Sequence, residues 1–264
     1  MPVCIALAAA LTLGFAAGGR VQAADQLTPI SSGDELGLVR VRCVTDSNFE
    51  ILFRAALVQV EQLSVEHEIV LTAGHGLPRN VDTLRSQCVL IDAAGRDYRL
   101  HGAWRSDQHI RGLANDWAVL TTQRRLRRNQ PRLLVAAPSV EERRRMESAE
   151  SSLRLPLLTV AEERACALEQ SGISADERAR GLFSHTCRSW HGHSGSPILA
   201  LRGDAVVLIG IHLASRWFYE GQRSIKIGRY VDTAIMDAIY AAAGREPVSV
   251  DSEAVEKTDA APAL

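Results

Sequence analysis

The stretch Gly192-His193-Ser194-Gly195-Ser196-Pro197 carries a serine in a glycine-rich turn, directly before a predicted strand. Two upstream stretches belong with it: residues 70–75, VLTAGH, and residues 115–120, NDWAVL. A histidine, an aspartate and a serine therefore follow one another along the chain. A serine hydroxyl becomes nucleophilic when an imidazole takes its proton and a carboxylate orients and stabilises that imidazole. We therefore predict a catalytic set of His75, Asp116 and Ser194.

Glycine at position 192 allows the backbone before the serine to turn tightly. The N–H groups of Gly192 and Ser194 are then the predicted donors to the oxyanion that develops when a serine attacks a carbonyl. A glycine- and serine-rich turn without chemical meaning is the alternative for this stretch taken alone. The presence of all three motifs in order favours the catalytic interpretation.

Short segments that are β-branched or alternate between apolar and polar residues, broken by glycine-bearing or polar turns, predict strands in two groups. The first group comprises residues 38–43, 51–60, 68–72, 88–92, 98–104 and 117–121, and the second comprises 154–160, 197–201, 205–213 and 224–227. Many short strands in two clusters favour a pair of β-barrels. Capping and helical spacing predict helices over residues 139–145 and 232–243.

The composition limits the classes of partner. With 264 residues and 46% hydrophobic content the chain can bury a substantial core. A formal net charge of -1 produces no field that would recruit nucleic acid or an anionic membrane, so neither is an expected partner. Arginine clusters over residues 124–128 and 143–145 are expected to be solvent-exposed. No segment after residue 25 is long and apolar enough to span a membrane.

The two ends of the chain differ from its middle. Residues 1–23 combine an apolar run with small residues at Val21 and Ala23, which predicts a cleaved signal peptide. An uncut N-terminal membrane anchor is the alternative, because the segment before the apolar run lacks a lysine or arginine. The main domain is expected over residues 24–246, secreted or periplasmic, and a disordered tail over 247–264.

Cleavage of the predicted signal peptide would remove Cys4 and leave four cysteines, an even number. An even count in an exported chain fits disulfides, and four cysteines allow three pairings. We predict Cys43–Cys88 and Cys166–Cys187, because each pair falls within one half of the chain. A zinc site is the weaker alternative, since no pair has the short spacing of a zinc motif.

The three motifs resemble those of trypsin-like serine proteases of the chymotrypsin clan, over roughly residues 36–243. The resemblance implies an all-β fold of two six-stranded antiparallel β-barrels, about 36–130 and 150–230, with a C-terminal α-helix. It implies a cleft between the barrels in which His75 is general base, Asp116 the orienting carboxylate and Ser194 the nucleophile. The implied protein is a monomeric serine endopeptidase that acts on protein or peptide substrates and needs no cofactor.

The chain departs from the usual protease pattern at two places. Gly74 and Gly76 flank the histidine, where the family usually has alanine and a disulfide-bonded cysteine. His193 stands where digestive relatives carry an aspartate that pairs with a new N-terminus after zymogen cleavage. A histidine cannot serve as that anion, so activation by that ion pair is not expected. The pattern resembles exported bacterial members most.

The specificity pocket is predicted from the same resemblance. Its base lies six residues before the nucleophile, at Arg188, with Ser189 beside it. The triplet Gly210-Ile211-His212 resembles the glutamyl endopeptidases, in which this histidine receives an acidic side chain. An arginine, an imidazole and a hydroxyl would supply charge-assisted donors to a carboxylate. The alternative is that Arg188 points to solvent and His212 is a packed strand residue.

The sequence allows three other functional interpretations. His185, His191 and His193 crowd the serine loop, but their arrangement on a short turn argues against a metal site. An esterase nucleophile elbow requires glycine two residues after the serine, where Ser196 stands, and its histidine would come last. A catalytically inactive, protease-like binding module remains the alternative function.

Overall fold

The computed structural model describes residues 37–59, 66–106, 112–126, 130–148, 153–154, 165–169, 171–202, 205–218 and 223–244. The predicted signal peptide and C-terminal tail lie outside these residues, so both stay predictions. No helix of the described residues has the length and apolar character needed to cross a membrane.

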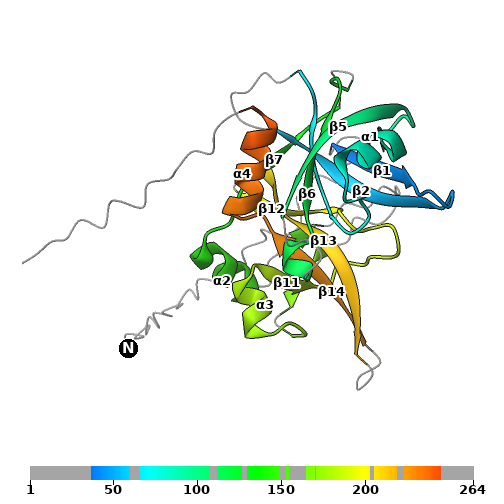
Figure 1. Ribbon diagram of the computed structural model, residues 1–264. Helices are drawn as coiled ribbons and strands as arrows, with labels where there is room; N and C mark the ends of the chain where they lie inside the picture. The colour runs from blue at the N-terminus through cyan, green and yellow to red at the C-terminus, as the bar shows by residue number, and fades with distance from the viewer. Residues whose placement is uncertain are drawn as a thin grey trace, which may run out of the picture.

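The first half of the chain forms a closed antiparallel barrel of six strands (Figure 1). Its strands are β1 (Leu38–Val44), β2 (Glu50–Gln59), β3 (Ile69–Thr72), β4 (Cys88–Ile91), β5 (Asp97–Arg105) and β6 (Ala118–Thr122). They pair in the order β1-β4-β5-β6-β3-β2, and pairing of β2 with β1 closes the ring. All six strands are predicted by the sequence. Their inward side chains, including Val41, Leu57, Val70 and Leu90, form one buried cluster.

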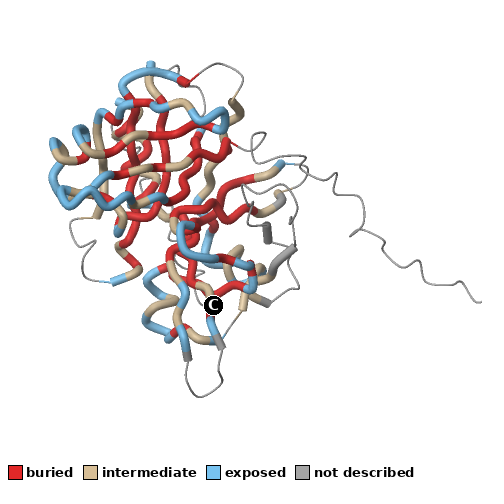
Figure 2. The backbone as a smooth tube through the Cα atoms, turned by 90° about the vertical axis from the view of Figure 1, so that its right-hand side faces the viewer, coloured by how far each residue is buried: buried red, intermediate tan, exposed pale blue. Residues whose placement is uncertain are grey.

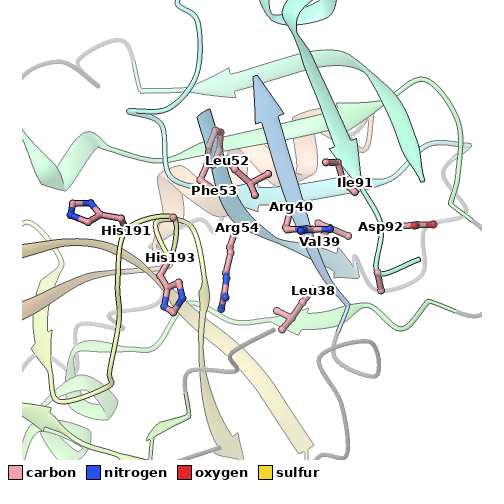
Figure 3. A pocket seen from close by; sticks show the side chains of 12 residues that line it. Leu38, Val39, Arg40, Leu52, Phe53, Arg54, Ile91, Asp92, His191 and His193 are labelled. Atoms are coloured by element: carbon pink, nitrogen blue, oxygen red, sulfur yellow. The ribbon is translucent and has the colours of Figure 1, made fainter. Parts of the chain in front are cut away.

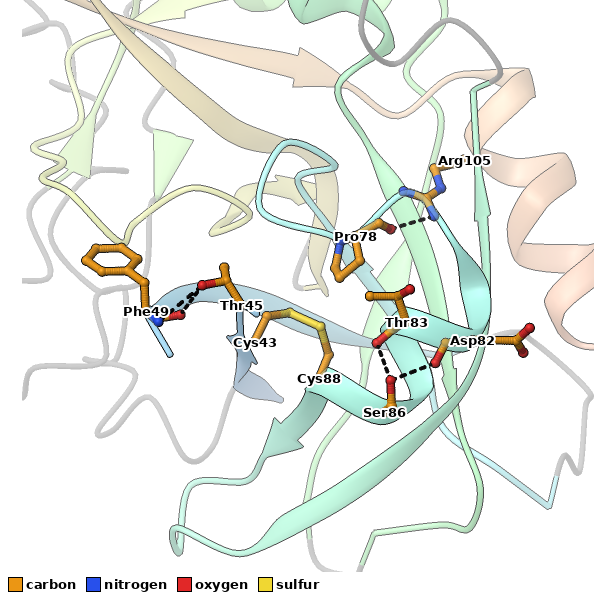
Figure 4. Close-up of a disulfide and its surroundings, with 9 residues drawn as sticks. All are labelled: Cys43, Thr45, Phe49, Pro78, Asp82, Thr83, Ser86, Cys88 and Arg105. Carbon is orange, nitrogen blue, oxygen red and sulfur yellow. Dashed lines mark hydrogen bonds between the residues drawn. A yellow bond between two sulfur atoms is a disulfide. The ribbon is translucent and has the colours of Figure 1, made fainter. Parts of the chain in front are cut away.

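A disulfide joins Cys43 of β1 to Cys88 of β4, as predicted (Figure 4). The two residues are directly paired in the antiparallel register, so the bond crosses between neighbouring strands. Cys187 is also disulfide-bonded. The side chain of Cys166 lies outside the described residues, and its pairing with Cys187 stays a prediction.

The second half contributes a further antiparallel sheet. In spatial order it contains β9 (Ala165–Cys166), β8 (Leu153–Arg154), β12 (Pro197–Arg202), β13 (Ala205–Phe218), β14 (Arg223–Tyr230), β11 (Leu182–His185) and β10 (Leu168–Glu169). Among the described strands this sheet is not closed by pairing, so the second six-stranded barrel stays a prediction. Strand β7 (Leu133–Val135) runs parallel to both β2 and β13 and links the two halves.

Within the described residues, four α-helices and one short 3-10 helix accompany the strands. The sequence predicts α2 (Val140–Ser148) and α4 (Thr233–Ala242) but misses α1 (Val81–Gln87) and α3 (Ala175–Ala179). Helix α4 begins at Asp232, whose carboxylate accepts a hydrogen bond from the N–H of Ile235 at 3.1 Å. Its buried face packs beside the first barrel, as Figure 1 shows.

The largest buried cluster joins the two halves. It combines Leu71 and Val119 of the first barrel with Leu208, Ile211 and Ile227 of the second sheet. Figure 2 shows buried backbone running through both halves and across their junction. Residues at that junction are therefore held by strands from both sides.

Candidate functional site

His75 and Asp116 form a tightly bonded pair at the junction. His75 Nδ1 lies 2.6 Å from Asp116 Oδ2, and the backbone N–H of His75 donates to Asp116 Oδ1 at 2.7 Å. One carboxylate therefore fixes both the ring and the main chain of the histidine. The Asp116 side chain is 5% exposed and that of His75 is 49% exposed, so the acid is buried and the imidazole reaches the surface.

The local sequence explains this geometry. Asp116 directly follows the 3-10 helix η2 (Leu113–Asn115) and precedes β6, while His75 follows the end of β3. A Cβ at Gly74 would lie 3.3 Å from Asp116 Oδ1 and 3.3 Å from the carbonyl oxygen of Trp117. Such contacts are tighter than side chains normally make, so glycine before the histidine lets the carboxylate approach. The glycine at position 74 therefore has a steric reason.

The pKa of His75 is raised above its ordinary value. The hydrogen bond that His75 donates to Asp116 is the main cause, burial opposes it, and the negative charge of Asp116 adds to the increase. The Asp116 carboxylate favours the Nδ1–H form of the ring. The other ring nitrogen, Nε2, is then the one available to take a proton.

Two consecutive tight turns shape the Ser194 loop. The N–H of His193 donates to the carbonyl of Trp190 at 3.1 Å, and the N–H of Ser196 donates to the carbonyl of His193 at 3.0 Å. The third residue of each turn is a glycine with positive φ, 84° at Gly192 and 81° at Gly195. Type II turns require this conformation at that position, which side chains other than glycine adopt at a cost.

The first barrel and the second sheet both hold this loop. The N–H of Arg54 on β2 donates to the carbonyl of Ser194 at 2.9 Å, and the N–H of Gly195 donates to the carbonyl of His212 on β13 at 2.8 Å. A Cβ at Gly195 would lie 2.0 Å from the carbonyl oxygen of Arg54 and 2.3 Å from Thr72 Oγ1. The loop therefore sits against backbone that cannot move aside, and this fixes the place of Ser194.

A cleft of about 660 Å³ contains all three predicted catalytic residues in its walls, namely His75, Asp116 and Ser194. The Ser194 hydroxyl donates to the carbonyl of Leu213 at 3.0 Å rather than to His75. Within the described chain, the N–H groups of Gly192 and Ser194 donate no hydrogen bond to other protein atoms. The cleft thus holds a histidine–aspartate pair, a serine hydroxyl and two N–H groups available to a ligand.

Phe53 packs against Gly76, directly after the histidine. A Cβ at Gly76 would lie 2.7 Å and 2.8 Å from two carbon atoms of the Phe53 ring. The ring is buried in the barrel and also lines the cleft. An aromatic side chain packed on a glycine therefore fills this position.

One wall of the cleft contains a cation, an imidazole and a hydroxyl. Ser189 and His212, both predicted to bind substrate, line the cleft, and Ser189 Oγ is buried without a hydrogen-bond partner. Arg188, predicted at the base, is exposed and is not part of this wall. The cation in the wall is Lys226, whose Nζ donates to Ser215 Oγ at 2.9 Å. The sequence did not single out Lys226; its register opposite Ser215 on β13 depends on the sheet pairing.

A buried histidine pair lies behind this wall. His185 Nε2 lies 3.1 Å from His212 Nδ1. Burial lowers the pKa of His185 to about 3 and holds that of His212 well below its ordinary value, so both rings are neutral at pH 7. When His185 donates in this bond, the remaining proton of His212 is on Nε2, as a donor to a ligand.

The histidines of the serine loop do not gather into a metal site. A search of the described residues finds no group of three or more His, Cys, Asp or Glu side chains that could hold a metal ion. His191 is exposed, whereas His193 is buried against Trp190, with the ring centroids 5.3 Å apart. Burial lowers the pKa of His193 to about 4, so this residue is neutral at pH 7.

A scan against protein-family models gives no match for this chain, and a search of curated proteins gives no significant match.

Proposed function

We propose that this chain is a serine endopeptidase of the chymotrypsin-like type, with His75, Asp116 and Ser194 as its catalytic residues. The observation that carries the proposal is the 2.6 Å contact between His75 Nδ1 and Asp116 Oδ2, in a cleft that Ser194 also lines. The closed first barrel, the second antiparallel sheet and helix α4 support the same assignment. The second sheet would complete the second barrel of that fold.

The proposed reaction begins when the Ser194 hydroxyl turns from the Leu213 carbonyl toward His75. His75 Nε2 takes the hydroxyl proton while Ser194 Oγ bonds to the substrate carbonyl carbon, and the carbonyl oxygen becomes an oxyanion. The N–H groups of Gly192 and Ser194 stabilise this oxyanion. His75 then gives the proton to the leaving amine as the C–N bond breaks, and water hydrolyses the acyl-enzyme by the same steps. Asp116 stabilises the imidazolium throughout.

We further propose that the substrate carries an acidic residue directly before the cleaved bond. Lys226, His212 and Ser189 supply a cation, an imidazole and an unpartnered hydroxyl in one wall of the cleft. Burial lowers the pKa of Lys226, and a bound carboxylate would raise it again because opposite charges favour each other's ionised forms. Arg188 stays a predicted contributor to this site.

A fluorophosphonate probe tests the catalytic assignment, because it reacts covalently with an activated serine. We expect the full chain to be labelled at pH 8 and the Ser194→Ala variant to remain unlabelled. Ser196→Ala is a matched control in the same loop, since Ser196 Oγ has no hydrogen-bond partner. Labelling of Ser194→Ala equal to that of the parent would overturn the assignment.

A catalytically inactive, protease-like binding module is the second candidate function. It is favoured by the hydrogen bond of Ser194 Oγ to Leu213, which leaves the serine unpaired with His75. If the chain binds peptides without cleaving them, the probe leaves it unlabelled at every pH while peptide binding is retained.

Cleavage of a peptide library tests the acidic preference. We expect peptides with glutamate before the cut to be cleaved faster than those with glutamine, lysine or phenylalanine. The Lys226→Met variant should lose most of the preference for glutamate over glutamine. Equal cleavage of glutamyl and glutaminyl peptides by the parent would remove the specificity proposal and leave the catalytic one intact.

The location of the protein is proposed to be extracytoplasmic, secreted or periplasmic. The Cys43–Cys88 disulfide supports this, because disulfides persist in oxidising compartments.

A further inference from the structure

A second cavity, of about 370 Å³, adjoins the cleft and shares Leu52, Phe53, His191 and Gly192 with it. Its other walls come from β1, β2 and the turn that follows β4 (Figure 3). Three of its polar lining residues are Arg40, Arg54 and His193, and we call it the arginine cavity after the first two.

Arg54 is a buried cation without a side-chain hydrogen bond or ion pair in the described part of the chain. Its side chain points from β2 into this region, the residue is 9% exposed, and its Nη1 atom is buried without a hydrogen bond. Burial and the nearby charge of Arg40 lower the pKa of Arg54 to about 10. An ionised group removed from water is strongly disfavoured unless an opposite charge compensates it.

Other arginines of this molecule show what such compensation looks like. The guanidinium of Arg229, which is 6% exposed, donates to the carbonyl of Ala114 at 2.7 Å and pairs with Asp232. Arg132 makes a two-pronged contact with the buried Glu68 carboxylate, at 2.8 and 2.6 Å. Arg54 has neither kind of partner among the described residues.

Among the described residues, one acidic side chain lines the arginine cavity, and it is already bound elsewhere. Asp92 accepts hydrogen bonds from the backbone N–H and Nε of Arg96, at 2.8 and 2.7 Å, and from the hydroxyl of Tyr98 at 3.1 Å. Figure 3 shows its carboxylate at the far edge of the cavity from Arg54. The described lining of the cavity therefore keeps an excess of positive charge.

His193 adds a neutral hydrogen-bonding group. Its Nδ1 atom is buried without a partner, and the charge of Arg54 is close enough to help lower its pKa. With His193 neutral, the arginine cavity carries two guanidinium charges and an unsatisfied imidazole nitrogen.

The remaining lining identifies the chemistry that would fit. Leu38, Val39, Leu52, Phe53 and Ile91 give the cavity an apolar wall around its cationic centre. A guanidinium fork matches a carboxylate or phosphate, but an apolar wall favours an organic body over a bare inorganic anion. We propose that the arginine cavity is a binding site for a small organic carboxylate, held by Arg54 and Arg40 with His193 as hydrogen-bonding partner.

This site is coupled to the serine loop through the main chain. Arg54, whose side chain would hold the carboxylate, also donates its backbone N–H to the Ser194 carbonyl. His193 precedes the serine in sequence. A bound carboxylate would therefore order the loop that carries Ser194, whatever reaction that serine performs.

The test uses the full chain with the substitutions Ser194→Ala and Lys226→Met. With these changes, neither turnover nor binding at the cleft wall contributes to the measured heat. Isothermal titration at pH 7 and low salt compares 4-methylpentanoate with its neutral counterpart, 4-methylpentanamide, and with inorganic phosphate. We expect one carboxylate to bind per chain, and the amide to bind about tenfold to hundredfold more weakly, because hydrogen bonds to charged groups contribute about 1.5–3 kcal/mol. Equal binding of acid and amide, binding of phosphate alone, or no binding overturns the proposal.

Two variants in this background assign the site. Arg54→Met should weaken carboxylate binding at least about tenfold and, without ligand, unfold at a higher temperature than its parent, because an uncompensated buried charge is gone. Arg54→Lys keeps the charge but loses the fork, and should also weaken binding; it decides the outcome if Arg54→Met does not fold. Unchanged affinity in the folded variants overturns the proposal. If acetyl-leucine binds more tightly than 4-methylpentanoate, the carboxylate is that of a peptide C-terminus; if it binds more weakly, the ligand is a free acid. Both outcomes support the proposed carboxylate site.

Discussion

Replacing Asp116 with asparagine tests the proposed catalytic pair most directly. The carboxylate accepts from the His75 backbone at 2.7 Å and contacts His75 Nδ1 at 2.6 Å. The asparagine amide can keep one acceptor, but its NH₂ group would then face Nδ1 and favour the tautomer with the proton on Nε2. A histidine in that tautomer cannot take the proton of Ser194.

The size of the effect follows from the contact that is lost. The amide oxygen can keep the bond from the His75 N–H, so the loss is that of the charged bond to Nδ1, about 1.5–3 kcal/mol, or at least about 10- to 150-fold in rate. The pH dependence should change as well. Since Asp116 raises the pKa of His75, labelling by a fluorophosphonate in the parent should rise with pH through a midpoint above 6.5. In Asp116→Asn the midpoint should move to lower pH.

The assay is the rate of fluorophosphonate labelling between pH 5 and pH 9, with circular dichroism to show that the variant is folded. Asp82→Asn is the matched control, because the Asp82 side chain is 85% exposed on α1 and does not line the cleft. A labelling rate for Asp116→Asn equal to that of Asp82→Asn, with an unshifted midpoint, would refute the proposed role of Asp116.

Three further predictions concern stability. Gly195→Ala should destabilise the fold by more than about 3 kcal/mol, because position 195 has a positive φ and the new Cβ would collide with backbone. Gly95 has a similar φ but open space around it, so Gly95→Ala should cost only about 1–2 kcal/mol. Urea unfolding measures both. Arg132→Met should cost about 3–5 kcal/mol by leaving the Glu68 carboxylate buried and unpaired, and Glu68→Gln in the same chain should recover part of that loss. The hydrogen bond from Arg216 lowers the pKa of Glu177 from 4.5 to about 2. The ionised Glu177 side chain therefore stabilises the fold above pH 4.5, and this stabilisation is lost as the pH falls toward 2. Glu177→Gln should therefore destabilise at pH 7 by about 1–3 kcal/mol and much less near pH 2, and an equal loss at both pH values would contradict this reasoning.

Periodicity was sufficient to locate the long elements. The first six strands and helices α2 and α4 follow from alternation, capping and glycine stops, because these signals are local. Helices α1 and α3 were missed because they are short, and the capping box of Ser174 and Glu177 lies in a polar segment without an apolar face. Strand β11 was missed because its residues are all buried and show no alternation.

Some residues of the candidate site could be predicted from local sequence, and others could not. Motif order predicted His75, Asp116 and Ser194, and the structure brings them to one cleft. The sequence did not predict Lys226 in the cleft wall, because strand register across β13 and β14 determines which side chain faces the cleft. The role of Arg188 stays a prediction.

The sequence by itself determined the strands of the first barrel and the identity of the candidate catalytic residues, because each depends on residue type and local spacing. It predicted the Cys43–Cys88 pairing among three possibilities, and the register of β1 with β4 decided it. Only the tertiary structure decided that Ser194 bonds to Leu213, that Phe53 packs on Gly76, and that Arg54 is buried without a partner. These features arise where segments distant in the sequence meet, and their energies depend on contacts that no local pattern encodes.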